Sequence, residues 1–567
     1  MKKIQGCPLP LGVTIQGDIV NFSVAVPSKK DCKLLLYRVG EETPSHTYSM
    51  SEEKLVGEVR YLALKEFEWK KYEYNYKIDD EVIVDPYVRC LQGRKRFGDE
   101  VSIQNHEIRG KIDTIEFDWE DDAPLQIPYQ DIVAYSLHVR GFTQHISSKV
   151  KHRGTYSGII EKISYLQDLG INQIQCMPIY EFEERRSYTN YWGYGPAYCF
   201  APKSSYAASE DSVTELKTMV KACHQAQIEV VLELPFTQET APQKIEECLR
   251  YYRINFHIDG FILNPEYVPM RGVKEDPILS TTKIMKNQDG FQITMRRFLK
   301  GDEGMVEDVM WWLKHHSKEE GIYNCIANHN GFTLADAVSY DGKHNELNGE
   351  HNQDGPNYNY SWNCGVEGAT RKKSVVELRK KQMKNAFFIL LMAQGTPCIL
   401  AGDEFAHTQK GNNNVYCQDN EISWIDWKQL EKNKELYVYV KTLIQLRQSH
   451  PILHPMEELL GVDQMSCGVP DVSYHGASAW QVPSEVASRQ LGVYYAGACA
   501  MDDDCFIAYN MHWEKHPFAL PALSKGKRWY KVVATDAEVA MGGEVIQDQK
   551  EVIVAERTIV MFIGRLV

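Results

Sequence analysis

The chain has 567 residues, 43% hydrophobic and 25% charged, which is ordinary for globular proteins but too long for a single hydrophobic core. Its formal net charge of −14 argues against a nucleic-acid backbone or an anionic membrane as a partner, because both require clustered Lys and Arg. Neutral polymers such as polysaccharides stay open, and nothing in the composition names a protein partner.

The flanks of the chain have the pattern of β domains. Residues 1–115 alternate apolar and polar side chains, as in 20–26 and 33–37, with turn-like polar clusters between these runs. Short strands return in 456–567, as at 505–509. We therefore expect an N-terminal and a C-terminal β-sandwich.

The middle of the chain, residues 116–455, alternates short apolar runs with amphipathic helices, which is typical of parallel βα units. Strands are expected at 132–137, 171–176, 229–234, 256–263, 282–285, 323–327 and 397–401, with an eighth near 291–295. Eight such units predict a central (β/α)8 TIM barrel.

The N-terminus, Met1 to Cys7, has no apolar run of signal-peptide length, and no apolar stretch of roughly 18 residues occurs in the chain. The 14 Cys are scattered without CxxC pairs, so reduced thiols are expected. No His/Cys cluster has metal-ligand spacing. The sequence thus predicts a cytoplasmic protein without cofactor or metal.

Several segments resemble a known family. The runs His-Asn-Glu-Leu-Asn-Gly-Glu at 344–350 and Asn-Tyr-Ser-Trp-Asn-Cys-Gly-Val-Glu-Gly at 359–368 closely resemble bacterial isoamylase, pullulanase and glycogen-debranching enzymes of glycoside hydrolase family 13. Further segments that agree with this family are 191–194, 200–202, 394–397, 401–405 and 470–476. Segments 10–14 and 84–87 are similar to the start and end of a family-48 carbohydrate-binding module.

The resemblance implies a retaining glycosidase, in which two carboxyl groups flank the scissile bond at about 5 Å separation. The family's nucleophile segment reads Asp-Gly-Phe-Arg-Phe-Asp, whereas this chain has Asp-Gly-Phe-Ile-Leu-Asn at 259–264. The nucleophile position is therefore Asn264, and the Arg that would steer it is Ile262. An amide is a poor nucleophile, and no guanidinium remains to keep a carboxylate ionised.

The other two carboxylate positions are also amides. The general-acid position falls on Asn287, after which about twenty residues usual in the family are missing, and the third carboxylate of His-Asp-Gly-Phe-Thr-Leu is Asn330. A sugar-binding His after the third strand is Gln238. Changes spread over four segments indicate natural loss of the chemistry.

The resemblance implies that Tyr194 stacks on a sugar ring and that His329 holds sugar hydroxyls. Trp192, Asn264 and Asn330 are further candidates for glucan contact, although a tryptophan in the place of Trp192 more often fills a core. Asp403 and Glu404 follow a strand and are expected in a structural hydrogen-bond network.

Three functions follow from these observations. The first is an inactive protein that binds or regulates an α-glucan such as glycogen or a starch-like oligosaccharide. The second is an active α-1,6-glucosidase whose carboxylates have moved, with Glu233, Glu266, Glu275 and Asp289 as candidates, each of which also reads as a solvated loop charge. The third is a scaffold for a protein partner with the old cleft closed.

Overall fold

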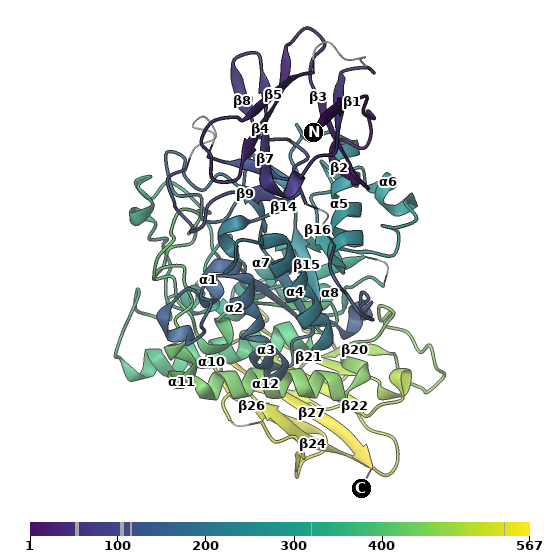
Figure 1. The fold of residues 1–567 in the computed structure, drawn as a ribbon. Coiled ribbons are helices and arrows are strands. Elements are labelled where there is room, and N and C mark those ends of the chain that lie inside the picture. The colour runs from purple at the N-terminus through teal and green to yellow at the C-terminus, as the bar shows by residue number, and fades with distance from the viewer. Residues whose placement is uncertain (51–55, 102–106, 114–115, 319, 538, 567) are drawn as a thin grey trace.

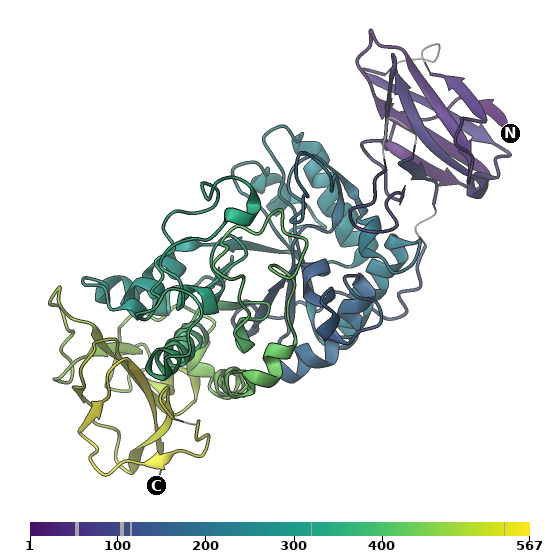
Figure 2. The ribbon, with the colours of Figure 1, turned by 90° about the vertical axis from the view of Figure 1, so that its left-hand side faces the viewer.

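A computed structural model describes residues 1–50, 56–101, 107–113, 116–318, 320–537 and 539–566. Three parts follow one another along an elongated molecule: N-terminal sheets at one end, a barrel with helices around it, and C-terminal sheets at the other end (Figure 1, Figure 2). Residue 115, where the first domain was expected to end, lies outside the described residues.

The N-terminal part consists of two antiparallel sheets around one core. One sheet has the order β1 (Lys2–Ile4), β6 (Val59–Lys65), β3 (Ile19–Ala25), β2 (Gly12–Gln16). The other has the order β5 (His46–Ser49), β4 (Cys32–Arg38), β7 (Tyr72–Ile78), β10 (Arg109–Lys111), β9 (Leu91–Gln92), with β8 (Glu81–Ile83) on β7. The strands expected at 20–26 and 33–37 are β3 and β4. Phe22 of β3 and Leu36 of β4 share the core, because alternate side chains of a strand point to one face.

Seven parallel strands form the closed barrel. They are β11 (Ala134–Leu137), β12 (Gln173–Cys176), β15 (Glu229–Glu233), β16 (Gly260–Ile262), β17 (Lys283–Asn287), β18 (Gly321–Asn324) and β19 (Thr396–Leu400). The ring closes because β11 pairs with both β12 and β19. All seven lie at or next to expected strands.

The prediction of an eighth strand near 291–295 is wrong. These residues lie in the helix α7 (Asp289–Lys300), whose buried Phe291, Met295 and Phe298 are four and three residues apart, the spacing of one helical face. β17 instead pairs directly with β18, with Met285 opposite Gly321. A Cβ atom at Gly321 would collide with the Met285 sulfur, so glycine permits this approach.

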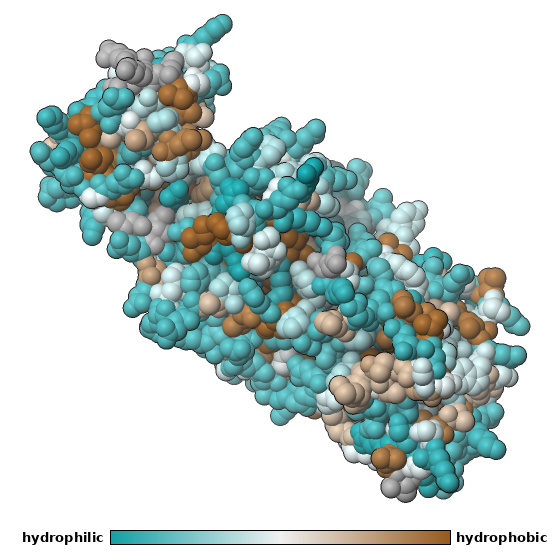
Figure 3. All heavy atoms as spheres, turned by 90° about the vertical axis from the view of Figure 1, so that its right-hand side faces the viewer, coloured by the Kyte–Doolittle hydropathy of each residue, from teal (hydrophilic) through white to brown (hydrophobic). Residues whose placement is uncertain are grey.

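Helices surround the strands (Figure 2). They are α1 (Val139–Thr143), α2 (Tyr156–Ile160), α3 (Ile163–Leu169), α4 (Ser212–Gln225), α5 (Pro242–Phe256), α6 (Met270–Glu275), α7, α8 (Val306–Lys314), α9 (Leu334–Ala337), α10 (Lys373–Met392), α11 (Lys428–Lys432) and α12 (Lys434–Ser449). Within the described residues, no helix is both long and apolar enough to cross a membrane. On the face in Figure 3, apolar residues are scattered among hydrophilic ones.

The C-terminal part again has two sheets around a core. The larger sheet has the order β20 (Val472–His475), β21 (Gln490–Tyr495), β22 (Asp504–Asn510), β27 (Thr558–Leu566), β24 (Lys527–Ala534), β25 (Glu544–Val545). The smaller sheet pairs β23 (His516–Ala519) with β26 (Glu551–Val554). Phe506 of β22, Phe518 of β23 and Trp529 of β24 pack in one cluster. The strand expected at 505–509 is therefore β22.

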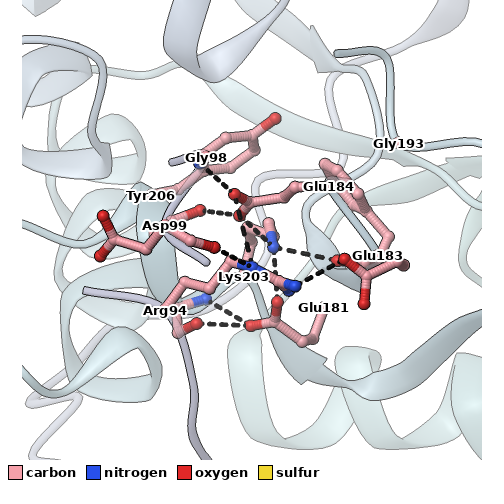
Figure 4. A network of polar contacts seen from close by, with 12 residues as sticks. Arg94, Gly98, Asp99, Glu181, Glu183, Glu184, Gly193, Lys203 and Tyr206 are labelled. Atoms are coloured by element: carbon pink, nitrogen blue, oxygen red, sulfur yellow. Dashed lines mark hydrogen bonds and ion pairs between the residues drawn. The ribbon is translucent and has the colours of Figure 1, made fainter. Parts of the chain in front are cut away.

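A buried ion cluster joins the N-terminal part to the barrel (Figure 4). It lies at the two-stranded sheet of β13 (Tyr180–Phe182) and β14 (Ala197–Pro202). The ammonium of Lys203, whose side chain is fully buried, lies 2.5 Å from Glu181 Oε1 and 2.6 Å from Glu184 Oε1. Arg94 reaches Glu183 Oε1 at 2.5 Å. The cluster is electrostatically compensated, which is what permits its burial.

Replacing this lysine should strongly destabilise the protein. The variant Lys203→Met leaves the buried Glu181 without a cation and the buried Glu184 with only Arg94 Nε, 3.9 Å away, so we expect the free energy of unfolding to fall by about 3–5 kcal/mol. Urea unfolding followed by tryptophan fluorescence measures the change. The control is Lys95→Met, because Lys95 and its partner Glu210 are 68% and 73% exposed and their pair is solvent-screened. Equal midpoints for the two variants would contradict the role given to the cluster.

The turn after β19 contains a second buried network. Glu404 Oε1 accepts hydrogen bonds from the hydroxyls of Tyr135, at 2.8 Å, and Tyr165, and Oε2 accepts one from the Gly402 N–H at 3.0 Å. Asp403 Oδ1 accepts the Leu334 N–H at 2.9 Å. Both carboxyls thus have the structural contacts that the sequence analysis preferred. Burial raises the pKa of Glu404 from 4.5 to about 7.

This raised pKa makes stability depend on pH. Between pH 4.5 and 7 the folded chain keeps the Glu404 proton while the unfolded chain has lost it, so this group lowers the free energy of unfolding as the pH rises through that window. We expect the stability of the wild type relative to Glu404→Gln to fall by roughly 3 kcal/mol from pH 4.5 to 7. Urea midpoints of both proteins across this range test it. A constant difference between them would show that the carboxyl does not titrate there.

Candidate functional site

The predicted site residues belong to the rim formed by the carboxyl ends of the barrel strands, where this fold places its chemistry. Asn264 follows β16 by two residues, Asn287 is the last residue of β17, and Asn330 follows β18. Glu233 is the last residue of β15, which is the neighbour of β16 in the ring. Closure of the barrel therefore places four strand ends that are distant in sequence at one rim.

Tyr194 projects from a tight turn between β13 and β14. The Asn190 side chain closes this turn: its Oδ1 accepts the Gly193 N–H at 3.1 Å, and its Nδ2 donates to Tyr194 O at 3.0 Å. Gly193 has φ +87°, a backbone conformation that glycine adopts without strain. The same Nδ2 donates to Glu183 O at 3.1 Å, which ties the turn to the ion cluster around Lys203. These hydrogen bonds to the backbone thus hold Tyr194 in position.

Tyr194, Glu233 and His329 form one hydrogen-bonded group. The Tyr194 hydroxyl donates to Glu233 Oε1 at 2.6 Å and lies 2.8 Å from His329 Nε2. Because the hydroxyl has a single proton, His329 must donate from Nε2 to the phenol oxygen. Burial, followed by the negative charge of Glu233, raises the pKa of Tyr194 well above 10. The phenol is therefore neutral, and the group offers one carboxylate and one imidazole.

Two neighbours support this group. Gln175 Nε2 donates to Glu233 Oε2 at 3.3 Å. The Trp192 ring lies edge-on to His329, with ring centres 5.1 Å apart. Trp192 is only 7% exposed and packs with Met177 and Tyr191. It acts as core, which leaves the half-buried Tyr194 as the aromatic surface at this point of the rim.

The three asparagines lie exposed at the rim, outside the hydrogen-bonded group of Tyr194, Glu233 and His329. Asn264 Oδ1 accepts the N–H of Glu266 at 3.0 Å and so closes its own loop. The backbone N–H of Asn330 donates to Asn328 Oδ1 at 3.0 Å. Exposed amides of this kind can donate to and accept from sugar hydroxyls, but an amide carries no acidic proton and no nucleophilic charge.

Ile262 stands where the family resemblance implies an arginine. Its side chain is 6% exposed and belongs to the apolar cluster inside the barrel, with Val231, Met285 and Tyr323. The interior below the nucleophile position is therefore filled with hydrocarbon. No guanidinium at position 262 supplies a positive field to an oxygen at the position of Asn264.

The four acidic residues considered as replacements lie in different surroundings. Glu233 is 9% exposed and hydrogen-bonded in the group described above. Glu266, Glu275 and Asp289 are exposed. Glu275 pairs with Arg271 at 2.8 Å on α6, and Asp289 is the first residue of α7, where the helix dipole favours a negative charge. Only Glu233 is therefore held among the predicted sugar-contacting residues.

Cavities distinguish the two ends of the barrel. At the rim, a cavity of about 50 Å³ lies beside His138, Trp192 and His329. Small-molecule sites usually measure about 300–1,000 Å³. A cavity of about 520 Å³ lies at the opposite end, beside Asp259 before β16 and Lys283, the first residue of β17. The cavity beside His138, Trp192 and His329 is thus much smaller than a usual small-molecule site.

The sequence analysis missed one group of polar side chains. It expected no metal-ligand spacing, yet His512, Glu514 and His516 bring one potential ligand atom each within 4.8 Å of one another. Their spacing of two residues was the available signal, and the turn between β22 and β23 is what brings the three side chains together. This group lies in the C-terminal part, away from the barrel rim.

Comparison with known proteins agrees with the fold. The model of the α-amylase catalytic domain matches residues 135–244. Glycogen debranching enzyme of Erwinia tasmaniensis is 31% identical over an alignment covering 79% of this chain and 85% of that protein. Isoamylase 1, chloroplastic, of Arabidopsis thaliana is 28% identical, covering 94% of this chain and 84% of the relative.

A solved structure shows the same fold. The pullulanase of Paenibacillus barengoltzii, in complex with maltohexaose and α-cyclodextrin, superposes with a TM-score of 0.72 at 18% identity and covers 98% of this chain and 95% of that one. The resemblance to debranching enzymes is confirmed. The chain belongs to the α-amylase family, glycoside hydrolase family 13, and within it to the isoamylase and glycogen-debranching type.

Proposed function

We propose that this protein associates with α-glucans without hydrolysing them. The observation that carries the proposal is the set of amides at the three carboxylate positions, Asn264, Asn287 and Asn330, at the rim of an otherwise preserved barrel. A retaining mechanism needs a nucleophilic and an acidic carboxyl about 5 Å apart. Glu233 instead accepts hydrogen bonds from Tyr194 and Gln175. Neither of these residues supplies a second carboxyl group.

The catalytic acceleration lost with these carboxylates is large in free-energy terms. Enzymes accelerate slow hydrolyses by up to about 10¹⁷-fold, which corresponds to roughly 23 kcal/mol. Catalytic groups that act as a unit lose most of this effect when one is removed, leaving about 10³–10⁴-fold over water. Here all three are amides, and Ile262 adds an apolar surface where a cation would act. Positioning alone cannot sustain debranching.

The residues that we expect to bind a glucan, in contrast, are present. Tyr194 presents a half-buried ring held by Glu233 and His329, and rigid aromatic rings beside fixed hydrogen-bonding groups suit sugar recognition. We assign residues 1–115 the role of a family-48-like carbohydrate-binding module, because of the segments at 10–14 and 84–87. The relatives named above are a glycogen debranching enzyme and an isoamylase, and the pullulanase structure contains maltohexaose.

A scaffold for a protein partner is the second candidate. The small cavity of about 50 Å³ at the rim favours it, because a shallow rim gives a glucan chain little enclosed surface. An active enzyme with relocated carboxylates is less well supported, since Glu233 is the only proposed replacement held in the group. The cytoplasmic location stays a prediction.

The absence of hydrolysis can be measured directly. We expect no reducing-end release from glycogen, amylopectin or pullulan above that of heat-denatured protein, even at high protein concentration, because neither a nucleophile nor an acid is in place. An active debranching enzyme assayed in parallel is the positive control. Release that is proportional to protein, survives repurification and is abolished by Glu233→Gln would establish the relocated-carboxylate reading.

Glucan association needs a separate test. We expect the protein to be retarded in native gels containing glycogen, with about a tenfold weaker apparent affinity for Tyr194→Ala, because that variant removes the aromatic surface and frees Glu233. The matched control is Tyr530→Ala, which removes another half-buried tyrosine, from β24, at the far end of the molecule. Unretarded migration of the wild type, together with recovery of a specific partner by crosslinking, would favour the scaffold.

A further inference from the structure

A turn in the C-terminal part brings together three metal-ligating side chains. It joins β22, which ends at Asn510, to β23, which begins at His516. One ligand atom each from His512, Glu514 and His516 lies within 4.8 Å of the other two. The two imidazole ring centres are 4.6 Å apart and nearly perpendicular, at 82°. Small side-chain rotations therefore suffice to direct all three at one point.

Several contacts that do not involve the three side chains hold the backbone of the turn. The buried Asn510 accepts the His512 N–H at 3.1 Å through Oδ1 and donates to Glu514 O at 2.9 Å through Nδ2. The N–H of Arg557 donates to His512 O at 2.9 Å. A binding site is accurate when its backbone is held by such supporting contacts. The ligands are thus mounted on a turn that does not depend on the metal.

One imidazole nitrogen of the group is buried and unpaired. Nε2 of His516 is inaccessible to solvent and has no hydrogen-bond partner. Leaving a buried polar atom unpaired costs about 1–3 kcal/mol, so native structures rarely do so without a reason. A cation bound at this nitrogen would satisfy it. This observation is independent of the spacing that brings the three side chains together.

The ligand chemistry selects the class of cation. Two imidazoles and one carboxylate are the ligand set of many zinc sites, with Zn–N distances of about 2.0–2.1 Å and a fourth position left for water. Imidazole suits zinc, nickel and copper, whereas calcium and magnesium prefer oxygen. Bound metal would also displace one existing contact, the acceptance of the Glu514 N–H by His512 Nδ1 at 3.0 Å, because an imidazole that ligates through one nitrogen is protonated at the other.

We propose that His512, Glu514 and His516 bind one divalent transition-metal ion of the zinc class. The site stabilises the contact between the C-terminal sheets and the barrel. Arg557, which holds the turn through its N–H, also donates from its guanidinium to the carbonyls of Leu299 and Lys300 at the end of α7, at 3.3 and 3.1 Å. Metal binding would thus brace a turn that contacts the end of α7 through this arginine.

Titration of the full-length, chelator-treated protein with zinc chloride in a calorimeter tests the site. The wild type should bind one zinc ion more than the double variant His512→Ala/His516→Ala, and Glu514→Gln should weaken that binding at least tenfold. Lys515→Gln, an exposed non-ligand in the same turn, is the control and should bind as the wild type does. Cobalt added to the wild type should give visible absorption bands that zinc abolishes.

The outcomes separate the proposal from non-specific binding. Equal zinc stoichiometry and affinity in the wild type and the double variant would overturn it, as would a cobalt spectrum that is unchanged by Glu514→Gln. If the double variant does not fold, as judged by circular dichroism, the exposed Glu514→Gln decides the matter alone, because that substitution removes no buried contact. A zinc-dependent rise in the melting temperature of the wild type and Lys515→Gln, absent from Glu514→Gln, would support the structural role.

Discussion

Closure of the parallel sheet is the constraint on which the rest of the molecule depends. β11 hydrogen-bonds to β12 on one side and to β19 on the other, so Ala134 becomes a neighbour of both Gln173 and Cys398. A closed ring of parallel strands gathers all carboxyl ends at one rim. With α7 in place of a strand, β17 pairs directly with β18, and the ring keeps its rim with seven strands. The rim at which this fold places its chemistry is thus present with seven strands.

The changes at the rim are physically coupled. An arginine at position 262 would lie among Val231 and Met285 inside the barrel, where a charge is stable only beside an opposite charge. In this chain position 264 is an amide, and isoleucine at position 262 fills the apolar interior. The uncharged residues Ile262 and Asn264 are therefore compatible as a pair. The carboxylate that stands beside them is Glu233, opposite Ile262 in the pairing of β15 with β16.

The N-terminal part and the rim are connected through contiguous contacts. Arg94 binds Glu183, and the side chain of Asn190 donates to the carbonyl of Glu183 and to that of Tyr194. Lys203 neutralises the neighbouring carboxylates in the same buried cluster. The ring proposed to meet a glucan is therefore positioned by a network that includes the module preceding the barrel. This arrangement ties the placement of one aromatic side chain to the docking of two domains.

The sequence by itself indicated the central parallel barrel, the family and the amides at positions 264, 287 and 330, because strand periodicity and long motifs such as 344–350 are local properties. It did not determine the strand count: the apolar residues at 291–295 suit either period, and only pairing of β17 with β18 decided that they are helical. Nor could it show that Trp192 is core or that Glu233 joins Tyr194, since both depend on contacts between distant segments. Local pattern specifies elements, and tertiary packing decides which side chains meet.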